Sequence, residues 1–143
     1  MGPVCASRNA LPPGVEEADG FSDLFLTEPN YREEILLVRD GSRVHTNVPH
    51  LVTHHSPDGY EWGYGGSGPA DLALNVVEAA LRDLGHKGPL VECWQGRCFR
   101  EAYQLHQDFK RELIAGVPHS GGSISWGSVL EWMRESTEVG ALR

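Results

Sequence analysis

Hydrophobic and polar positions divide the chain into a strand-rich part up to about residue 64 and a helix-rich part after it. Two β-prone runs, Ile35–Arg39 and Arg43–Val48, flank Asp40-Gly41, a pair typical of a tight hairpin turn. Pro57-Asp58-Gly59 provides a second turn, because proline presets φ and glycine accepts a positive φ. We therefore expect an antiparallel meander of about four strands within residues 34–64.

Helical periodicity follows this region. A helix beginning at Pro69 is predicted to bury one stripe, composed of Ala73, Val77, Ala80, Leu81 and Leu84. A second helix, from about residue 98 to 115, is predicted to share one inner face among Phe99, Ala102, Tyr103, Phe109 and Leu113. Gly121-Gly122 reads as a flexible turn, and Ser128-Val-Leu-Glu131 is a capping-box pattern for a last helix.

Strands followed by helices indicate an α+β fold, with a small antiparallel sheet packed by two main helices plus a short C-terminal helix. The 143 residues have room for one domain. We assign residues 1–33 to a flexible acidic N-terminal arm, residues 34–136 to a single α+β domain and residues 137–143 to a C-terminal tail.

Charge narrows the class of partner. The formal net charge is -8, and residues 1–34 hold seven acidic side chains against Arg8 and Arg32. Such a balance opposes direct nucleic-acid binding and suits a partner protein with a basic surface. The sequence displays no apolar run long enough for a membrane span and no secretory signal, so we expect a cytoplasmic protein without membrane partners.

A glycine loop precedes the first helix. Its Gly63-x-Gly65-x-x-Gly68 spelling matches the dinucleotide fingerprint, but it follows a turn instead of a buried parallel strand. A second interpretation is an anion site made by backbone N–H groups of Gly65, Gly66, Ser67 and Gly68. The favoured interpretation is a packing corner, in which Gly65 or Gly66 takes a positive φ.

Two chemical alternatives involve the histidines. His55, Ser56 and Asp58 are the candidates for acid–base or nucleophilic catalysis, although no Gly-x-Ser-x-Gly elbow surrounds Ser56. On a strand His54 and His55 face opposite ways, so they would not share a metal. Three cysteines give no disulfide framework, and a zinc site would combine a histidine with Cys93, Cys98 and His106 without any enforcing spacing. We expect no metal or cofactor.

The block from His55 to Ala70, His-Ser-Pro-Asp-Gly-Tyr-Glu-Trp-Gly-Tyr-Gly-Gly-Ser-Gly-Pro-Ala, together with Phe109-Lys110, resembles a family of uncharacterised bacterial and phage proteins. The resemblance covers about residues 36–133 and implies a prokaryotic or phage origin, hence the bacterial host cytoplasm. Its signature is a His-Ser-Pro-x-Gly-[Phe/Tyr]-x-Trp-Gly-Tyr-Gly-Gly-Ser-Gly-Pro-Ala stretch. The chain departs from the family in its long N-terminal arm and in the insert of residues 84–97.

We expect a non-enzymatic protein-binding regulator that engages a host macromolecular machine, with transcription machinery and inhibition of RNA polymerase as the first candidate. Aromatic and arginine side chains anchor many interfaces. The expected contacts come from the acidic arm and the aromatic insert, through Phe21, Asp23, Phe25, Trp94, Arg97 and Arg100. The alternative is a small-ligand or anion-binding enzyme that uses the glycine loop with His55 and Ser56.

Overall fold

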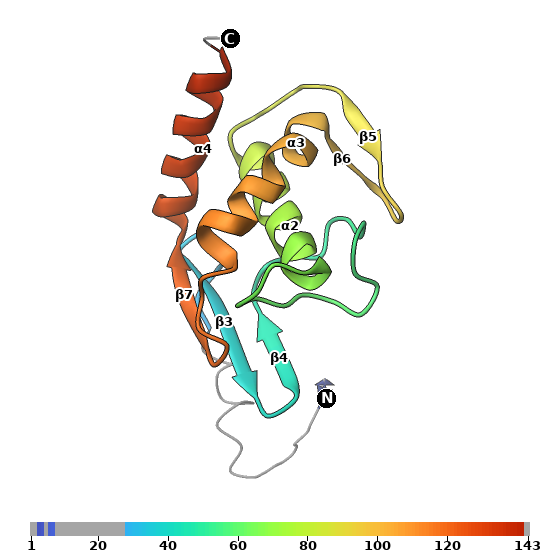
Figure 1. Cartoon of the computed structure of the whole chain (residues 1–143), viewed down its shortest axis with the longest axis vertical. Coiled ribbons are helices and arrows are strands. Elements are labelled where there is room, and N and C mark those ends of the chain that lie inside the picture. Colours follow the sequence, from blue (N-terminus) through green and yellow to red (C-terminus); the bar gives the residue numbers. More distant parts are fainter. Residues whose placement is uncertain (1–2, 5, 8–27, 142–143) are drawn as a thin grey trace.

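The computed structural model describes residues 3–4, 6–7 and 28–141, with side chains from Glu28 to Ser136. A small antiparallel sheet lies at one end of the described part, the helices lie beyond it, and a hairpin lies on the side away from the C-terminal helix (Figure 1). The α+β fold predicted from the sequence is confirmed. Its elements are β1 (Pro3–Val4), β2 (Ala6–Ser7), β3 (Glu34–Asp40), β4 (Arg43–Thr46), α2 (Ser67–Asp83), β5 (Leu90–Glu92), β6 (Arg97–Phe99), α3 (Arg100–Phe109), the π-helix η1 (Lys110–Ile114), β7 (Gly121–Ser125) and α4 (Trp126–Ala141).

The predicted β3–β4 hairpin is present. Asp40 pairs with Arg43, so the two turn residues are Gly41 and Ser42, one position later than the sequence suggested. Gly41 has a φ of 65°, the left-handed conformation that a two-residue hairpin turn requires. The hairpin forms one edge of a three-stranded sheet with the order β4-β3-β7.

The third strand, β7, comes from the other end of the domain, and the predicted meander of four strands up to residue 64 is wrong. Residues 47–66 contain no strand apart from an isolated bridge between Thr53 and Gln95. Gly121, expected in a flexible turn, begins β7 with a φ of 120°. A Cβ there would lie 2.2 Å from the carbonyl oxygen of Leu37, so only glycine lets the two strands approach this closely.

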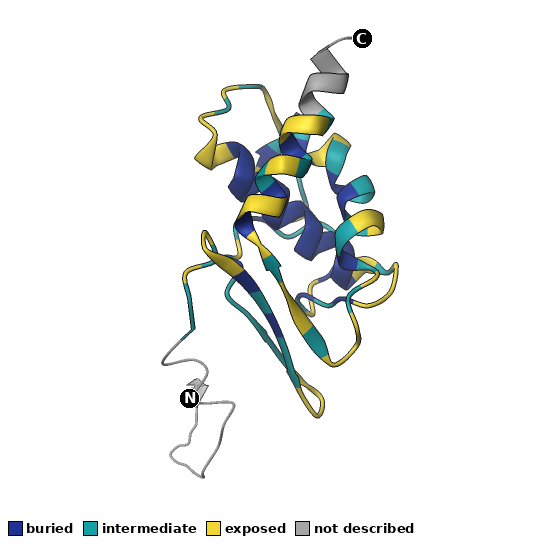
Figure 2. Cartoon of the chain, turned by 90° about the vertical axis from the view of Figure 1, so that its left-hand side faces the viewer, coloured by how far each residue is buried: buried dark blue, intermediate teal, exposed yellow. Residues whose placement is uncertain are grey.

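Helix α2 lies at the centre of the domain and is buried on all sides from Gly68 to Leu81 (Figure 2). It contacts α3, η1, α4 and β6. The single stripe predicted from periodicity is therefore too narrow, since Leu72, Leu74 and Val76 are also fully buried. Leu84, predicted to be buried, is 49% exposed because it follows the last helical residue.

Three buried polar side chains follow one line along α2: Asp71, Asn75 and Glu78. We call them the α2 polar stripe. Asn75 accepts hydrogen bonds from the backbone N–H groups of Leu51 and Val52 at 2.6 and 3.0 Å, and it donates to the carbonyl of Val52 at 2.8 Å. These bonds replace a strand partner for a segment that otherwise lacks one.

Glu78 likewise accepts a backbone hydrogen bond, at the start of α3. One of its carboxylate oxygens accepts the N–H of Phe99 at 2.8 Å, and the other accepts the Nε–H of Arg82 at 2.9 Å. A carboxyl group inside a core is tolerated only when its oxygens are bonded in this way. The stripe therefore connects α2 to the irregular segment at Leu51 and Val52 and to the junction between β6 and α3.

The second predicted helix is divided between α3 and η1, and this division changes its inner face. A π-turn, closed by a 2.8 Å bond from Ala115 N–H to the carbonyl of Lys110, makes Phe109 and Ile114 the consecutive buried residues. Tyr103, predicted on the inner face, is 41% exposed, and His106 is buried instead with 2% exposure. A π-turn advances by more residues than an α-turn, so Ile114 is buried in place of the predicted Leu113. Tyr103 was misplaced for a different reason, because it is His106 that lies at ordinary helical spacing from the buried Ala102 and Phe109.

Helix α4 begins at Trp126, earlier than the predicted capping box. The hydroxyl of Ser125 accepts the N–H of Ser128 at 3.1 Å, so Ser125 is the capping residue. Val129 and Met133 are fully buried on its inner face. The helix continues to Ala141, into the residues that the sequence assigned to a C-terminal tail.

Replacing Asn75 by alanine is expected to lower the free energy of unfolding by about 3 kcal/mol, because two N–H groups and one carbonyl lose their buried partner. Urea denaturation followed by circular dichroism measures the change. Gln104→Ala removes the same kind of amide from an exposed position on α3 and should alter stability by less than about 0.5 kcal/mol. Equal losses in the two variants would contradict a supporting role for Asn75.

Candidate functional site

The Asp71 side chain organises the segment that contains the candidate histidines. Its two oxygens accept the backbone N–H groups of His54, His55 and Ser56 at distances between 2.9 and 3.3 Å. Three successive amides directed at one carboxylate bend the chain around it. Asp71 therefore binds the protein's own backbone.

This bend brings His54 and His55 together, contrary to the expectation for a strand. Their rings contact edge to face, with centroids 4.7 Å apart, and the ring of His54 also contacts that of Tyr103 at 5.2 Å. The Nδ1 atom of His54 is buried without a hydrogen-bond partner among the described residues. The side-chain alternation used in the prediction applies only to extended backbone.

His55 and His106 form the centre of this histidine cluster. Their Nε2 atoms lie 2.9 Å apart, and Nδ1 of His106 lies 2.7 Å from the carbonyl oxygen of Tyr103. A carbonyl can only accept, so Nδ1 of a neutral His106 carries the proton and its Nε2 has a free lone pair. His55 must then donate through Nε2.

Both imidazoles resist protonation. Burial lowers the pKa of His106 to about 4, with further lowering from the neighbouring His55 and His54 and opposition from the hydrogen bond to Tyr103. Burial also lowers the pKa of His55, and the charge of Asp71 partly offsets this effect. The pair is therefore neutral at pH 7. A proton on Nε2 of His106 would break their mutual hydrogen bond, whereas His55 accepts a proton at Nδ1 and keeps it.

The three predicted catalytic residues are not assembled into one site. His55 faces His106, Ser56 is buried, and Asp58 lines a pocket beside Tyr60. Among the described residues no hydrogen bond joins the hydroxyl of Ser56 to His55 or Asp58. The Pro57-Asp58-Gly59 turn itself is as predicted, with Gly59 N–H bonded to the carbonyl of Ser56 at 3.3 Å and a φ of 108° at Gly59.

No metal centre is assembled either. In the part of the chain that the structure describes, no three histidine, cysteine, aspartate or glutamate side chains are placed to hold a metal ion. Cys93 and Cys98 do lie together, with their sulfurs 3.4 Å apart, but His106 is bonded to His55 and Tyr103.

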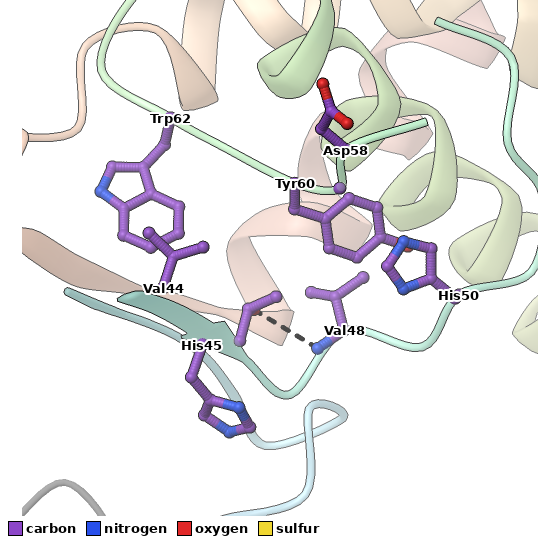
Figure 3. A pocket seen from close by; sticks show the side chains of 9 residues that line it. Val44, His45, Val48, His50, Asp58, Tyr60 and Trp62 are labelled. Carbon is purple, nitrogen blue, oxygen red and sulfur yellow. Dashed lines mark hydrogen bonds between the residues drawn. The ribbon is translucent and has the colours of Figure 1, made fainter. Parts of the chain in front are cut away.

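A pocket of about 270 Å³ opens between β4 and the segment that leads to the glycine loop. Figure 3 shows Val44 and Trp62 toward one end of it, and Val48, Tyr60 and His50 toward the other. His50 stacks on Tyr60 with centroids 4.0 Å apart, and Tyr60 donates to the carbonyl of Pro49 at 2.7 Å. The volume is just below the range of about 300–1,000 Å³ typical of drug-sized ligands. The pocket could take a small, partly apolar molecule.

The four residues proposed for anion binding, Gly65, Gly66, Ser67 and Gly68, lie at the N-terminus of α2, where Gly66 is the capping residue. The prediction of a positive φ at Gly65 or Gly66 is wrong; Gly63 takes it, with a φ of 86°. Gly66 instead lies beneath the ring of Tyr64, and a Cβ on Gly68 would lie 2.8 Å from the Cβ of Glu61. The residues before the loop form no strand, so the dinucleotide fingerprint lacks its βαβ context.

The predicted aromatic insert forms the β5–β6 hairpin. Trp94 is 60% exposed in its turn, and Gln95 makes two backbone bonds with Thr53 at 2.9 and 2.8 Å. Arg97 is exposed beside Glu92, at 3.8 Å, and Arg100 begins α3. Phe21, Asp23 and Phe25, predicted in the acidic arm, lie outside the described residues.

Sequence reasoning missed the α2 polar stripe and the position of His106. A signal for the stripe exists, because Asp71, Asn75 and Glu78 recur at helical spacing in an otherwise apolar run. Polar residues on a helix are ordinarily read as its solvent side. His106 has a signal as well, because it lies four residues after Ala102 and three before Phe109, at ordinary helical spacing.

Residues 30–87 match a family of unknown function (DUF6166). The matched range contains β3, β4, the irregular segment and α2, which supports an uncharacterised domain there; β5–β6, α3, β7 and α4 follow it. No curated protein and no solved structure matches the chain. Among the helices of the described residues, none has the length and apolarity needed to cross a membrane.

Stability should fall as the pH drops from about 6.5 to about 4, because the folded pKa of His106 lies below its ordinary value of 6.5 and the unfolded chain binds the proton first. The contribution is fully present above pH 6.5, and about 3 kcal/mol is lost across this window. Urea midpoints measured at several pH values test it.

His106→Asn, which can still donate to the carbonyl of Tyr103, should flatten this part of the pH profile. The exposed His119 provides the control, and His119→Asn should leave the slope unchanged. A wild-type slope in His106→Asn would assign the pH dependence to other groups.

Proposed function

We propose that the protein is a binding protein that engages a partner protein through the Trp94 turn of the β5–β6 hairpin, together with its acidic N-terminal arm. The observation that carries this proposal is a large aromatic side chain, 60% exposed, on a backbone that is already held in place. Exposed tryptophans are disproportionately the anchors of protein interfaces.

The position of Trp94 favours binding at a low entropic cost. Its neighbour Gln95 is bonded through both backbone groups to Thr53, and Cys93 N–H bonds to the carbonyl of Gly96 at 3.0 Å across the turn. Binding of a partner would therefore restrict only the Trp94 side chain, and no entropy would be lost in ordering the loop. Leu90 on the same hairpin is also exposed, at 47%.

Charge suggests the kind of partner. Residues 1–34 carry seven acidic and two basic side chains, so a basic surface on the partner would attract the arm and speed encounter. Arg97, in the strand that follows the Trp94 turn, and Arg100, at the start of α3, suit hydrogen bonds to carboxylate or carbonyl groups at the rim of such an interface. The narrowest form of the proposal is a phage-related inhibitor of a bacterial host's RNA polymerase, since that machine presents basic surfaces to nucleic acid.

A second candidate is a small-ligand or anion-binding enzyme, and the 2.9 Å contact between His55 and His106 favours it. A depressed pKa leaves His55 neutral and able to act as a base near pH 7. Thermal shift against phosphate, nucleotides and divalent metals separates the candidates, because a ligand at a hundredfold its Kd adds about 2.7 kcal/mol of stability. A shift that His55→Asn abolishes would favour the enzyme.

Trp94→Ala should weaken capture of the partner at least about tenfold, the loss of roughly 1.4 kcal/mol expected when an interface anchor is truncated. Immobilised full-length protein is exposed first to purified bacterial RNA polymerase and then to bacterial lysate, with quantitative mass spectrometry as the readout. Deleting residues 1–27 should weaken capture further. Raising the salt concentration should weaken capture by the undeleted protein in the same way, because salt screens the charges of the arm.

Tyr64→Ala is the matched control, because Tyr64 is an exposed aromatic residue, at 51%, that does not belong to the hairpin. It should retain wild-type capture. Equal capture by wild type, Trp94→Ala and Tyr64→Ala would refute the hairpin as the binding surface. If another protein is captured but RNA polymerase is not, only the narrowest form of the proposal is refuted.

A further inference from the structure

Cys93 and Cys98 face each other at the base of the Trp94 turn. Their Sγ atoms lie 3.4 Å apart. The register pairs Val91 with Cys98, and side chains two positions apart on a strand share a face, so both cysteines project on the same side of the hairpin. Gly96, with a φ of 89°, supplies the bend that brings them together.

We propose that Cys93 and Cys98 are a redox-active pair that forms a reversible disulfide and closes a covalent ring around the Trp94 turn. A disulfide has an S–S distance of about 2.05 Å, so the sulfurs need to approach by only about 1.4 Å from the 3.4 Å of the thiols. The inference concerns this chain alone and does not depend on the partner proposed above.

Exposure sets the order of the reaction. Cys93 is half-buried and Cys98 is fully buried, so an oxidant reaches Cys93 first. With glutathione disulfide as the oxidant, the Cys93 thiolate attacks one sulfur, forms a mixed disulfide and releases one glutathione thiolate. Cys98 then loses its proton to solvent, attacks Sγ of Cys93 and expels the second glutathione. Two protein thiols are oxidised, and one glutathione disulfide is reduced to two glutathiones.

Burial also makes the exchange slow. It raises the pKa of Cys93 and, more strongly, the pKa of Cys98, whose thiol also faces Cys93. The thiolate is the reactive form, so its fraction and the reaction rate should increase about tenfold for each pH unit below the thiol pKa. Slow exchange suits a pair that stays reduced in an ordinary cytosol and closes under sustained oxidation.

The ring joins the strand ends on both sides of Trp94. In the reduced protein this turn is held by backbone bonds at Cys93 and Gln95. A covalent link between residues 93 and 98 would restrict the turn further and lower the mobility of the tryptophan ring. Oxidation would thereby alter the surface that the exposed side chain presents without unfolding the domain.

Peptide mapping gives a direct test. The full-length protein with Cys5→Ser is incubated without denaturant in glutathione buffers of increasing oxidised fraction, then alkylated and digested with trypsin. Cleavage after Arg97 separates the cysteines, so the disulfide joins the peptide of residues 88–97 to that of residues 98–100. The intact protein should lose about 2 Da on oxidation, regain them with dithiothreitol, and react about tenfold faster at pH 8 than at pH 7.

Single-cysteine variants are the matched controls. In the same background, Cys98→Ser should accumulate the Cys93–glutathione adduct, and Cys93→Ser should remain largely unmodified because Cys98 is fully buried. Acrylamide quenching of Trp94 fluorescence should fall on oxidation only in the protein with both cysteines. Two free thiols, or a stable glutathione adduct without linked peptides, in excess glutathione disulfide would overturn the inference.

Discussion

The hydrogen bonds from residues 54–56 to the Asp71 carboxylate are the interaction on which the rest of the structure depends. Helix α2 is surrounded by the other elements from Gly68 to Leu81, so each polar side chain buried there must find a partner inside the protein. Asp71 and Asn75 meet this requirement by bonding backbone groups of residues 51–56, which have no regular structure apart from the Thr53 bridge, and Glu78 meets it by accepting the N–H of Phe99 at the end of β6. Side chains of one helix thereby bond backbone groups that a neighbouring strand would bond in a sheet.

The same stripe supports the candidate binding surface. Asn75 holds Val52 and Asp71 holds His54, and Thr53, between them, bonds to Gln95 next to Trp94. A continuous path of hydrogen bonds thus leads from the centre of α2 to the exposed turn. The residues that match the family supply the support, while the hairpin that carries Trp94 follows the matched range.

The sequence correctly predicted the elements whose structure depends on neighbouring residues. The Gly41 hairpin, the Pro57 turn, the helical regions and the α+β class follow from turn residues and periodicity. The third strand could not be predicted, because β7 pairs with β3 across more than 80 residues and its glycines resemble a turn. The position of His106 agrees with helical spacing from Ala102 and Phe109, but its contact with His55 depends on the bend imposed by Asp71, which spacing does not encode. The sequence identified residues 84–97 as an insert, but it did not predict the backbone bonds that join Gln95 of this hairpin to Thr53.

Native-state hydrogen exchange tests the central claim most directly, namely that α2 holds residues 51–56 as part of the core. The amides of Val52, His55 and Ser56 should have protection factors within about tenfold of those of Val76 and Val77 in α2, since they open only with the whole domain. Protection as low as that of the exposed Lys87 amide would show that the segment opens on its own, and would contradict the account.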